Sequence, residues 1–188
     1  MTTSARERIL ESAYELFTHR SMRAVGVDEV IERAGVAKAT LYRHFPSKDD
    51  LVLAVLERRE ELWTHGWVER EARRRGVTPE AQLLAIFDLF DEWFHQNGFE
   101  GCSFINVLLE VDDRSHRVWQ ASAAHLATIR GVVKQLAIEA GLRDPTDFAR
   151  AWHILMKGSI VSACEGDPEA AKRAQRLARL LIDEHRGV

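Results

Sequence analysis

The sequence predicts an all-α protein, and three observations lead to this prediction. Apolar residues recur at three- and four-residue spacing along most of the 188-residue chain. The alternation of apolar and polar residues that marks a half-buried strand is nowhere sustained. Helix-start signals recur, among them three pairs of an N-cap residue and a proline at Thr78-Pro79, Asp144-Pro145 and Asp167-Pro168. We therefore expect three short N-terminal helices followed by a larger helical bundle.

The first helix is expected to begin after Ser4, because Ser4 and Glu7 form a capping-box pattern, and to run to about His19. Its inward face carries Ile9, Ala13, Leu16 and Phe17. The second helix is shorter and ends at Gly35, since glycine accepts the left-handed conformation of a helix C-cap. Its apolar stripe consists of Val27, Val30, Ile31 and Ala34.

The third helix is expected over about residues 37–45, with Leu41 and Phe45 facing inward. Pro46 ends this helix, and Ser47 provides the N-cap of a longer fourth one. The inner face of the fourth helix carries Leu51, Val55 and Leu56.

The fourth helix, over about residues 47–70, connects the two parts into which we divide the chain. The strongly charged run 70–76 indicates a frayed helix end or a connection between two functional halves. We expect an N-terminal domain at residues 1–50 and a C-terminal helical domain at residues 51–188.

The C-terminal domain begins with a helix at Thr78-Pro79 that closes near Asn97-Gly98. This helix carries Leu83, Phe87, Phe90 and Phe94 at helical spacing. A shorter segment follows Gly101-Cys102, and a long helix over about residues 113–140 ends at Gly141. Two last helices are expected at Asp144-Pro145 and Asp167-Pro168.

Composition excludes several classes of protein. A net charge of −3 disfavours a protein that coats nucleic acid by charge alone. Cys102 and Cys164 lie far apart without a CxxC motif, which suits a reducing compartment. The sequence has neither a signal peptide pattern nor an apolar run of membrane-spanning length. We therefore expect a soluble, cytoplasmic protein.

The short second and third helices with their tight glycine turn form a helix-turn-helix pattern, the geometry that offers one helix to the DNA major groove. The window 33–48 contains four cations and His44 but no carboxylate, and the window 19–27 contains Arg20 and Arg23, again without an acid. Such a local excess of cations is what phosphate binding requires.

The third helix supplies the candidate base-reading residues. Arg43 can donate two hydrogen bonds to guanine, Thr40 can contact a base edge, and Ala39 can approach a thymine methyl. The remaining candidates suit backbone phosphates, with Lys48 in the first turn of the fourth helix. The predicted DNA-binding residues are Lys38, Ala39, Thr40, Tyr42, Arg43, His44 and Lys48. The structural alternative is an ordinary three-helix cap with a solvated basic face.

The run from Val30 to Leu51 resembles the DNA-binding signature of the TetR (tetracycline repressor) family. The resemblance implies a homodimer, a palindromic operator, and repression relieved by a small ligand among the C-terminal helices. It also places Thr40, Tyr42, His44 and Lys48 at DNA-contacting positions of the family and Gly35 at its turn glycine. Two departures, Gly26 and Ala37, stand where the family commonly has a hydroxyl residue, and each removes a side-chain cap worth about 1 kcal/mol or less.

Most of the aromatic and apolar residues of the C-terminal half are expected to form the core. Apolar cavities between bundle helices are also where small-molecule sites form, and a few polar groups then orient the ligand. The candidates for a small apolar effector are Phe90, Trp93, Phe94, Cys102, Phe104, Asn106, Trp119, His125, Trp152, His153 and Met156. The eight histidines show no metal-ligand spacing, and no nucleophile motif is present, so we expect no metal, no cofactor and no enzyme.

The last two helices carry small residues on faces that must pack closely, among them Gly158, Ser159, Ala174 and Ala178. An isologous four-helix bundle of these helices would form the homodimer, while intrachain packing without a dimer is the alternative. The sequence thus predicts a homodimeric, ligand-responsive repressor that binds double-stranded operator DNA. Two alternatives are an effectorless or partner-switched DNA-binding regulator, and a helical ligand carrier or interaction module without operator binding.

Overall fold

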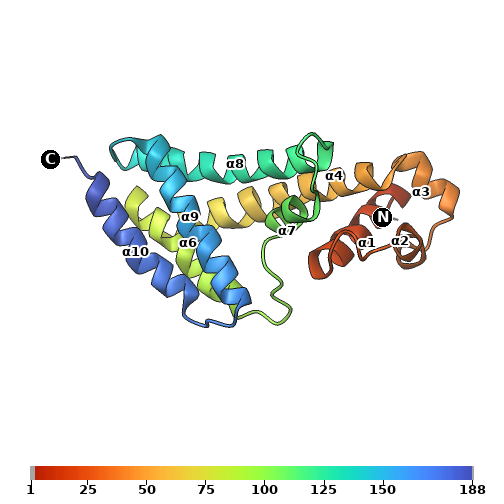
Figure 1. Ribbon diagram of the computed structural model, residues 1–188, viewed down its shortest axis with the longest axis horizontal. Helices are drawn as coiled ribbons and strands as arrows, with labels where there is room; N and C mark the ends of the chain where they lie inside the picture. The colour runs from red at the N-terminus through yellow and green to blue at the C-terminus, as the bar shows by residue number, and fades with distance from the viewer. Residues whose placement is uncertain (1–2, 188) are drawn as a thin grey trace. The chain divides into compact units, whose positions relative to one another are not determined.

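The computed structural model describes residues 3–187, and every regular element in that range is a helix (Figure 1). The helices group into two compact units. The first unit contains the chain up to Glu61 together with Cys102–His125, and the second contains Leu62–Gly101 and Leu126 onwards. The all-α class predicted from helical periodicity is therefore confirmed.

The first unit is built around four helices, α1 (Ala5–His19), α2 (Val27–Ala34), α3 (Lys38–His44) and α4 (Lys48–Arg59). In Figure 1 the first three lie together with the start of α4. Their shared core consists of Ile9, Leu10, Ala13, Leu16, Val25, Val30, Ala34, Leu41, Phe45, Leu51 and Val55. Burial of this apolar surface stabilises helices that are too short to be stable alone.

The ends of these helices follow the signals in the sequence. The hydroxyl of Ser4 accepts a hydrogen bond from the Glu7 amide, and Ser47 Oγ accepts one from the Asp50 amide, both at 3.2 Å. Gly35 ends α2 in the left-handed conformation, with φ 59° and ψ 46°. Gly26 and Ala37 precede α2 and α3 without a side-chain capping bond, as expected for residues without a hydroxyl.

The fourth helix is longer than predicted. After α4 the chain continues without a break through η1 (Glu60–Glu69), which is wound with the wider π-helical hydrogen-bond pattern, into α5 (Arg70–Arg75). The interpretation of residues 70–76 as a frayed end is wrong, because their charges are paired. Arg73 donates to Glu139 at 2.9 Å, and Arg74 donates to Glu71 at 2.8 Å.

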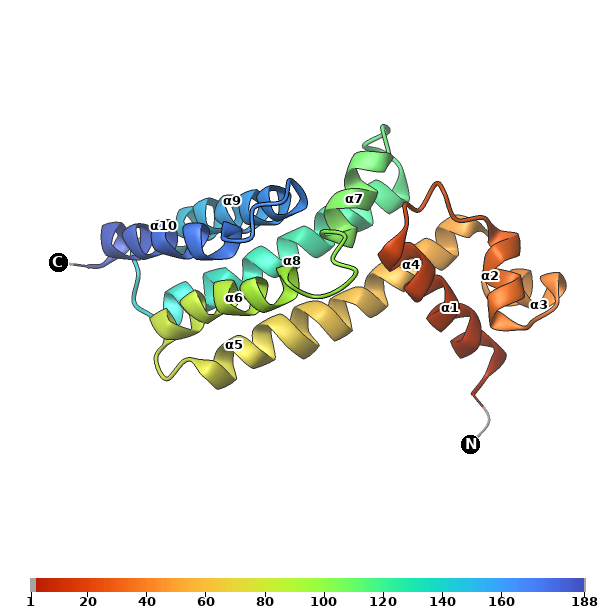
Figure 2. The same cartoon turned by 90° about the horizontal axis from the view of Figure 1, so that it is seen from below.

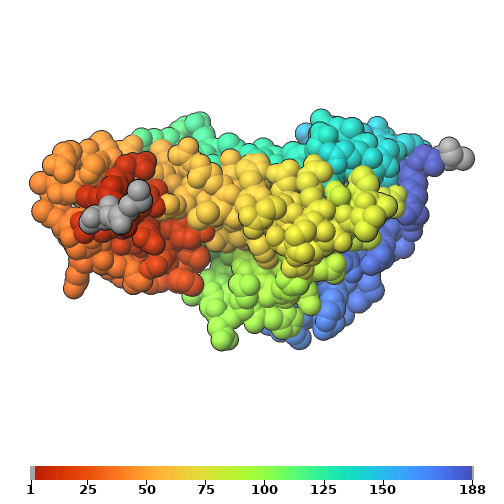
Figure 3. Space-filling view, turned by 180° about the vertical axis from the view of Figure 1, so that it is seen from behind, coloured from red at the N-terminus to blue at the C-terminus, as the bar shows by residue number. Residues whose placement is uncertain are grey.

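The second unit packs α5 against α6 (Pro79–Phe94), and α6 in turn against α9 (Pro145–Cys164) and α10 (Ala170–His185). Figure 2 shows α9 and α10 side by side, and in Figure 3 the yellow-green surface of α6 adjoins the blue surface of α10. Aromatic rings fill the interior: Phe87 lies 5.2 Å from Trp152, and Trp152 lies 5.3 Å from Phe148, between ring centroids.

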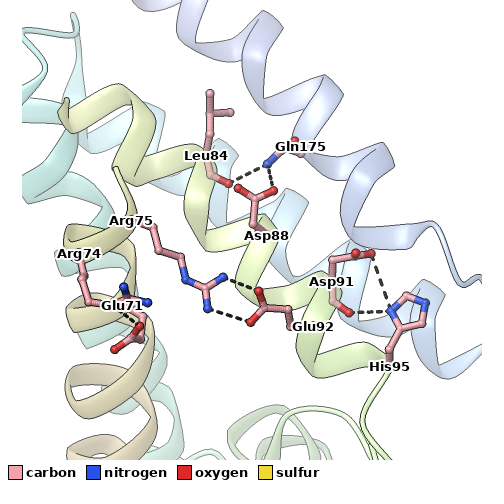
Figure 4. A network of polar contacts seen from close by, with 9 residues as sticks. All are labelled: Glu71, Arg74, Arg75, Leu84, Asp88, Asp91, Glu92, His95 and Gln175. Atoms are coloured by element: carbon pink, nitrogen blue, oxygen red, sulfur yellow. Dashed lines mark hydrogen bonds and ion pairs between the residues drawn. The ribbon is translucent and has the colours of Figure 1, made fainter. Parts of the chain in front are cut away.

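Polar side chains tie α5, α6 and α10 together at the surface of the second unit (Figure 4). Arg75 donates to Glu92 across α5 and α6, with Nη2 2.8 Å from Oε2. Gln175 of α10 donates to the Leu84 carbonyl at 3.0 Å and to Asp88 at 2.6 Å. These contacts fix the faces on which the three helices meet.

The later helices differ from the predictions mainly at their ends. The helix that starts at Thr78-Pro79 ends at Phe94, before Asn97-Gly98. Helix α8 (Arg117–Glu139) begins after the predicted residue 113, because the Ser115 amide and hydroxyl bond to the Asp113 carboxylate in a turn. The short segment after Cys102 forms α7 (Ser103–Glu110).

The two proline signals near the C-terminus also need correction. Helix α9 begins at Pro145 as predicted, but Asp144 has φ 47° and makes no side-chain capping bond. Helix α10 begins at Ala170, two residues after Pro168. There the Asp167 carboxylate accepts from the Glu169 amide at 3.0 Å and from Arg173 at 2.9 Å, so it closes a turn before the helix.

Candidate DNA interface

Helices α2 and α3 form a helix-turn-helix whose turn depends on Gly35. The left-handed conformation of Gly35 lets its amide and the Val36 amide bond to carbonyls of the last turn of α2. Both helices pack on α1, which leaves one side of α3 facing away from the core. This is the arrangement with which proteins place a short helix in the major groove.

The inner and outer faces of α3 separate as its periodicity predicted. Leu41 and Phe45 are buried, and Arg6 of α1 stacks over the Phe45 ring at 5.3 Å. The other predicted residues of the helix are accessible. Lys38, Ala39, Tyr42 and Arg43 are exposed, and Thr40 and His44 are half-buried. All six DNA-binding candidates of this helix are therefore at least partly accessible, and only Leu41 of its seven residues is buried.

Several cations of the two acid-free windows are paired with carboxylates that lie outside those windows. Lys38 Nζ lies 3.0 Å from Asp28 of α2, and this hydrogen bond and charge raise the pKa of Lys38. Arg20 pairs with Glu29, and Arg33 pairs with Glu15. The helical fold brings these carboxylates to the cations from other helices, a pairing that a linear window cannot reveal.

Arg43 and Lys48 stand apart from this pattern. Across residues 3–187, the ion pairs found involve neither of these two side chains. Arg43 is exposed in the last turn of α3, and Lys48 is half-buried in the first turn of α4. Two cations that take part in none of these ion pairs are thus available, one at the end of α3 and one at the start of α4.

The first turn of α4 is polar, and a side chain of α8 donates hydrogen bonds to it. Ser47 and Asp50 cap it, and Arg117 at the start of α8 donates to Asp50 Oδ1 at 2.8 Å and to Ser47 Oγ at 2.9 Å. The hydrogen bond from Arg117 lowers the pKa of Asp50, with Ser47 adding to the effect. Nothing in the sequence marks Arg117 for this role, because its partners lie almost seventy residues earlier.

The effector candidates divide between the two units. In the second unit Phe90 lies 5.6 Å from both Trp93 and Phe94 by ring centroids, while Trp152, His153 and Met156 are buried along α9. Trp63 and Trp67, which were not among the predicted residues, join this cluster, and the ring centroids of Trp63 and Trp93 lie 5.3 Å apart. Their four-residue spacing on a helix was the signal for a shared face.

In the first unit the candidates are Cys102, Phe104, Asn106, Trp119 and His125. Phe104 stacks on His125 with 5.1 Å between ring centroids, and His125 Nδ1 lies 2.6 Å from Glu60 Oε2. Cys102 is buried, whereas Asn106 is exposed on α7. Trp119 is half-buried below Arg114, whose guanidinium carbon lies 5.9 Å from the ring centroid.

Over the described range the structure contains no cluster of three or more histidine, cysteine or acidic side chains suited to a metal ion. Among the same residues, no helix combines the length and the hydropathy needed to cross a bilayer.

Two family models match the chain. Residues 9–55 match the model described as bacterial regulatory proteins of the tetR family, and residues 79–178 match the tetracyclin repressor-like C-terminal domain. A solved TetR-family transcriptional regulator from Streptomyces coelicolor is 30% identical, with a TM-score of 0.86 over 96% of this chain and 95% of that one. The second match supports the C-terminal half, which the sequence resembled only in its helical layout.

The similar curated proteins include one named a repressor and one named an activator. The HTH-type transcriptional repressor KstR2 from Rhodococcus jostii is 37% identical over 148 residues, which are 74% of this chain and 66% of KstR2. The HTH-type transcriptional activator FasR from Mycolicibacterium smegmatis is 37% identical over 92 residues, which are 49% of this chain and only 41% of FasR. The chain belongs to the TetR family and is a DNA-binding transcriptional regulator with a helix-turn-helix.

Proposed function

We propose that the protein is a homodimeric, ligand-responsive repressor that reads a palindromic operator with α3. In this proposal residues 1–50 form the DNA-binding domain and residues 51–188 the effector and dimerisation domain. The protein acts in the cytoplasm, where it meets double-stranded DNA. The observation that carries the proposal is the accessible outer side of α3, where Arg43 is exposed and takes part in no ion pair found within residues 3–187. Lys48 in the first turn of α4 is likewise outside the ion pairs of that range. Lys38, Ala39, Thr40, Tyr42 and His44 complete the proposed contacts.

Dimerisation is supported by an apolar face that α9 and α10 share. Ile154 is 69% exposed, Leu177 53% and Leu180 65%, although these side chains belong to regular helices of the second unit. Apolar grooves run beside them, and Gly158 leaves room for close approach. A second copy of this face would cover the exposed side chains and double the number of recognition helices.

A small apolar effector is supported by the aromatic interior of the second unit and by polar atoms within it. In the part of the chain that the structure describes, Trp152 Nε1 and Thr64 Oγ1 are buried without a hydrogen-bond partner. Unsatisfied buried donors are costly, and a ligand acceptor would relieve them. Phe90, Trp93, Phe94, His153 and Met156 are the proposed neighbours in this unit, and Cys102, Phe104, Asn106, Trp119 and His125 remain candidates in the first.

The proposal is tested by DNA binding of Arg43→Ala and Lys48→Ala. The probe is a duplex that the wild-type protein selects from genomic fragments, compared with a scrambled duplex. Loss of one bidentate guanine contact weakens binding by about 1–3 kcal/mol, and the Arg43 variant should also lose preference at one base pair of each half-site. The Lys48 variant should weaken binding to both duplexes and reduce the salt dependence.

Lys134→Ala, at an exposed position of α8, is the control and should bind as the wild type does. Unchanged affinity in both test variants, with the fold intact by circular dichroism, would refute α3 and α4 as the DNA-binding surface. The relative FasR is named an activator, so a promoter-reporter assay decides the direction of regulation.

A further inference from the structure

A segment of the first unit that is far from the helix-turn-helix in sequence contacts the N-terminal part of that unit at two places. This segment, Glu110–Arg117, runs from the end of α7 to the first residue of α8, and we name it the clamp segment. At one place the Arg23 amide, which precedes α2, donates to Glu110 Oε2 at 3.1 Å, and the Arg23 guanidinium lies 3.6 Å from Asp112.

The second place is the N-terminus of α4. Arg117 donates to Asp50 and Ser47, and its Nε lies 3.7 Å from Asp49 Oδ2. His116 Nε2 lies 3.3 Å from the same Asp49 oxygen. The clamp segment therefore places a cationic side chain and an imidazole against two neighbouring carboxylates, and it adds a hydrogen bond to the residue that caps α4.

These two carboxylates directly follow Lys48, the proposed phosphate contact. Acidic residues in a first turn stabilise the helix, because they complement its dipole. A DNA phosphate brought to the same turn is repelled by them, since like charges within one Debye length interact. The hydrogen bond from Arg117 lowers the pKa of Asp50, because the guanidinium favours the ionised carboxylate.

We propose that Arg117 is a positioning residue for operator binding, which holds the first turn of α4 and neutralises Asp49 and Asp50 so that Lys48 can receive a phosphate. This inference rests on the proposed DNA-binding role of Lys48. Arg117 itself need not touch DNA, because its guanidinium is already engaged by Asp50 and Ser47.

The test compares Arg117→Gln, Arg117→Lys and the matched control Arg114→Gln. Arg114 lies in the same segment and is exposed, and its contact is with the Trp119 ring. The probe is the genomic duplex selected by the wild-type protein. We expect Arg117→Gln to bind about tenfold more weakly at 0.1 M salt, since an uncompensated charge acts at both half-sites of a dimer. Arg117→Lys should recover most of the affinity, and Arg114→Gln should bind normally.

Two readouts separate the electrostatic role from a merely structural one. The ratio between wild type and Arg117→Gln should shrink as salt rises from 0.05 to 0.2 M, because screening weakens the repulsion. Asp49→Asn should restore binding in the Arg117→Gln background, because it removes one uncompensated negative charge. A merely structural role predicts no rescue, since the substitution adds no new contact to the first turn of α4. Circular dichroism confirms that the variants are folded.

The outcomes distinguish this inference from the proposed function. If Lys48→Ala weakens binding but Arg117→Gln does not, or if Asp49→Asn gives no rescue, the role of Arg117 is refuted while the DNA surface stands. If neither Lys48→Ala nor Arg43→Ala affects binding, the DNA surface itself is refuted.

Discussion

His153 should make the stability of this protein depend on pH between about 3 and 6.5. Its side chain is buried on α9 with 3% of its surface exposed, and it faces Arg130 of α8 and Lys157 one turn later on α9. Burial, followed by the charges of Lys157 and Arg130, lowers the pKa of His153 to about 3. Arg130 Nη1 lies 3.4 Å from Nδ1, so the neutral ring accepts at this nitrogen.

The sign and size of the effect follow from proton linkage. In the unfolded state His153 has its ordinary pKa of about 6.5. Below this pH the unfolded state therefore binds a proton that the folded state does not bind. The stabilisation is complete above pH 6.5 and is lost as the pH falls towards 3. At pH 5 the difference from pH 7.5 is about 2 kcal/mol, from about 1.36 kcal/mol for each of roughly 1.5 pH units. For a chain of this length this lowers the melting temperature by about 4–8 °C.

The assay is urea unfolding at pH 7.5 and pH 5 for the wild type and His153→Leu, at one protein concentration. The variant removes the titrating ring. The fall in its free energy of unfolding from pH 7.5 to pH 5 should therefore be about 2 kcal/mol smaller than the fall in the wild type. His19→Gln, which removes an exposed histidine of α1, is the control and should keep the wild-type pH dependence. An identical pH dependence in the wild type and His153→Leu would refute the reasoning.

Two further predictions concern backbone packing and assembly. Gly76→Ala should lower the free energy of unfolding by about 1–3 kcal/mol, because its Cβ would clash with the backbone of Ala81 and Gln82. The control Gly131→Ala, whose Cβ meets open space, should be neutral or stabilising in the same urea assay. Leu177→Asp with Leu180→Asp should convert a dimer into a monomer in light scattering, whereas Leu109→Asp on α7 should leave the dimer intact; a dimeric double variant would contradict the α9 and α10 interface.

The N-terminal helices were predictable because their signals are local. The hydroxyls of Ser4 and Ser47 and the backbone of Gly35 act within three or four residues of where they stand. The separation of buried Leu41 from exposed Arg43 on α3 likewise follows from the helical period alone.

The remainder depends on contacts between distant segments. The pairing of Lys38 with Asp28 requires knowledge of how α2 and α3 meet, and the pairing of Arg117 with Asp50 requires knowledge of where α8 begins. Proline signals gave the existence of α9 and α10 but not their caps, because Asp144 adopts a left-handed conformation and Asp167 closes a turn instead. Local sequence patterns therefore locate helices better than they locate the partners of charged side chains.

The uninterrupted helix of α4, η1 and α5 has a consequence for tolerance to changes in chain length. The π-helical part holds more residues per turn than an α-helix, so it contains surplus backbone. A one-residue deletion within Glu60–Glu69 can be absorbed by rewinding to the α-helical pattern. The same deletion within α3 has no such reserve and would turn every later side chain by about 100° around the helix axis, which would carry Arg43 away from its exposed face.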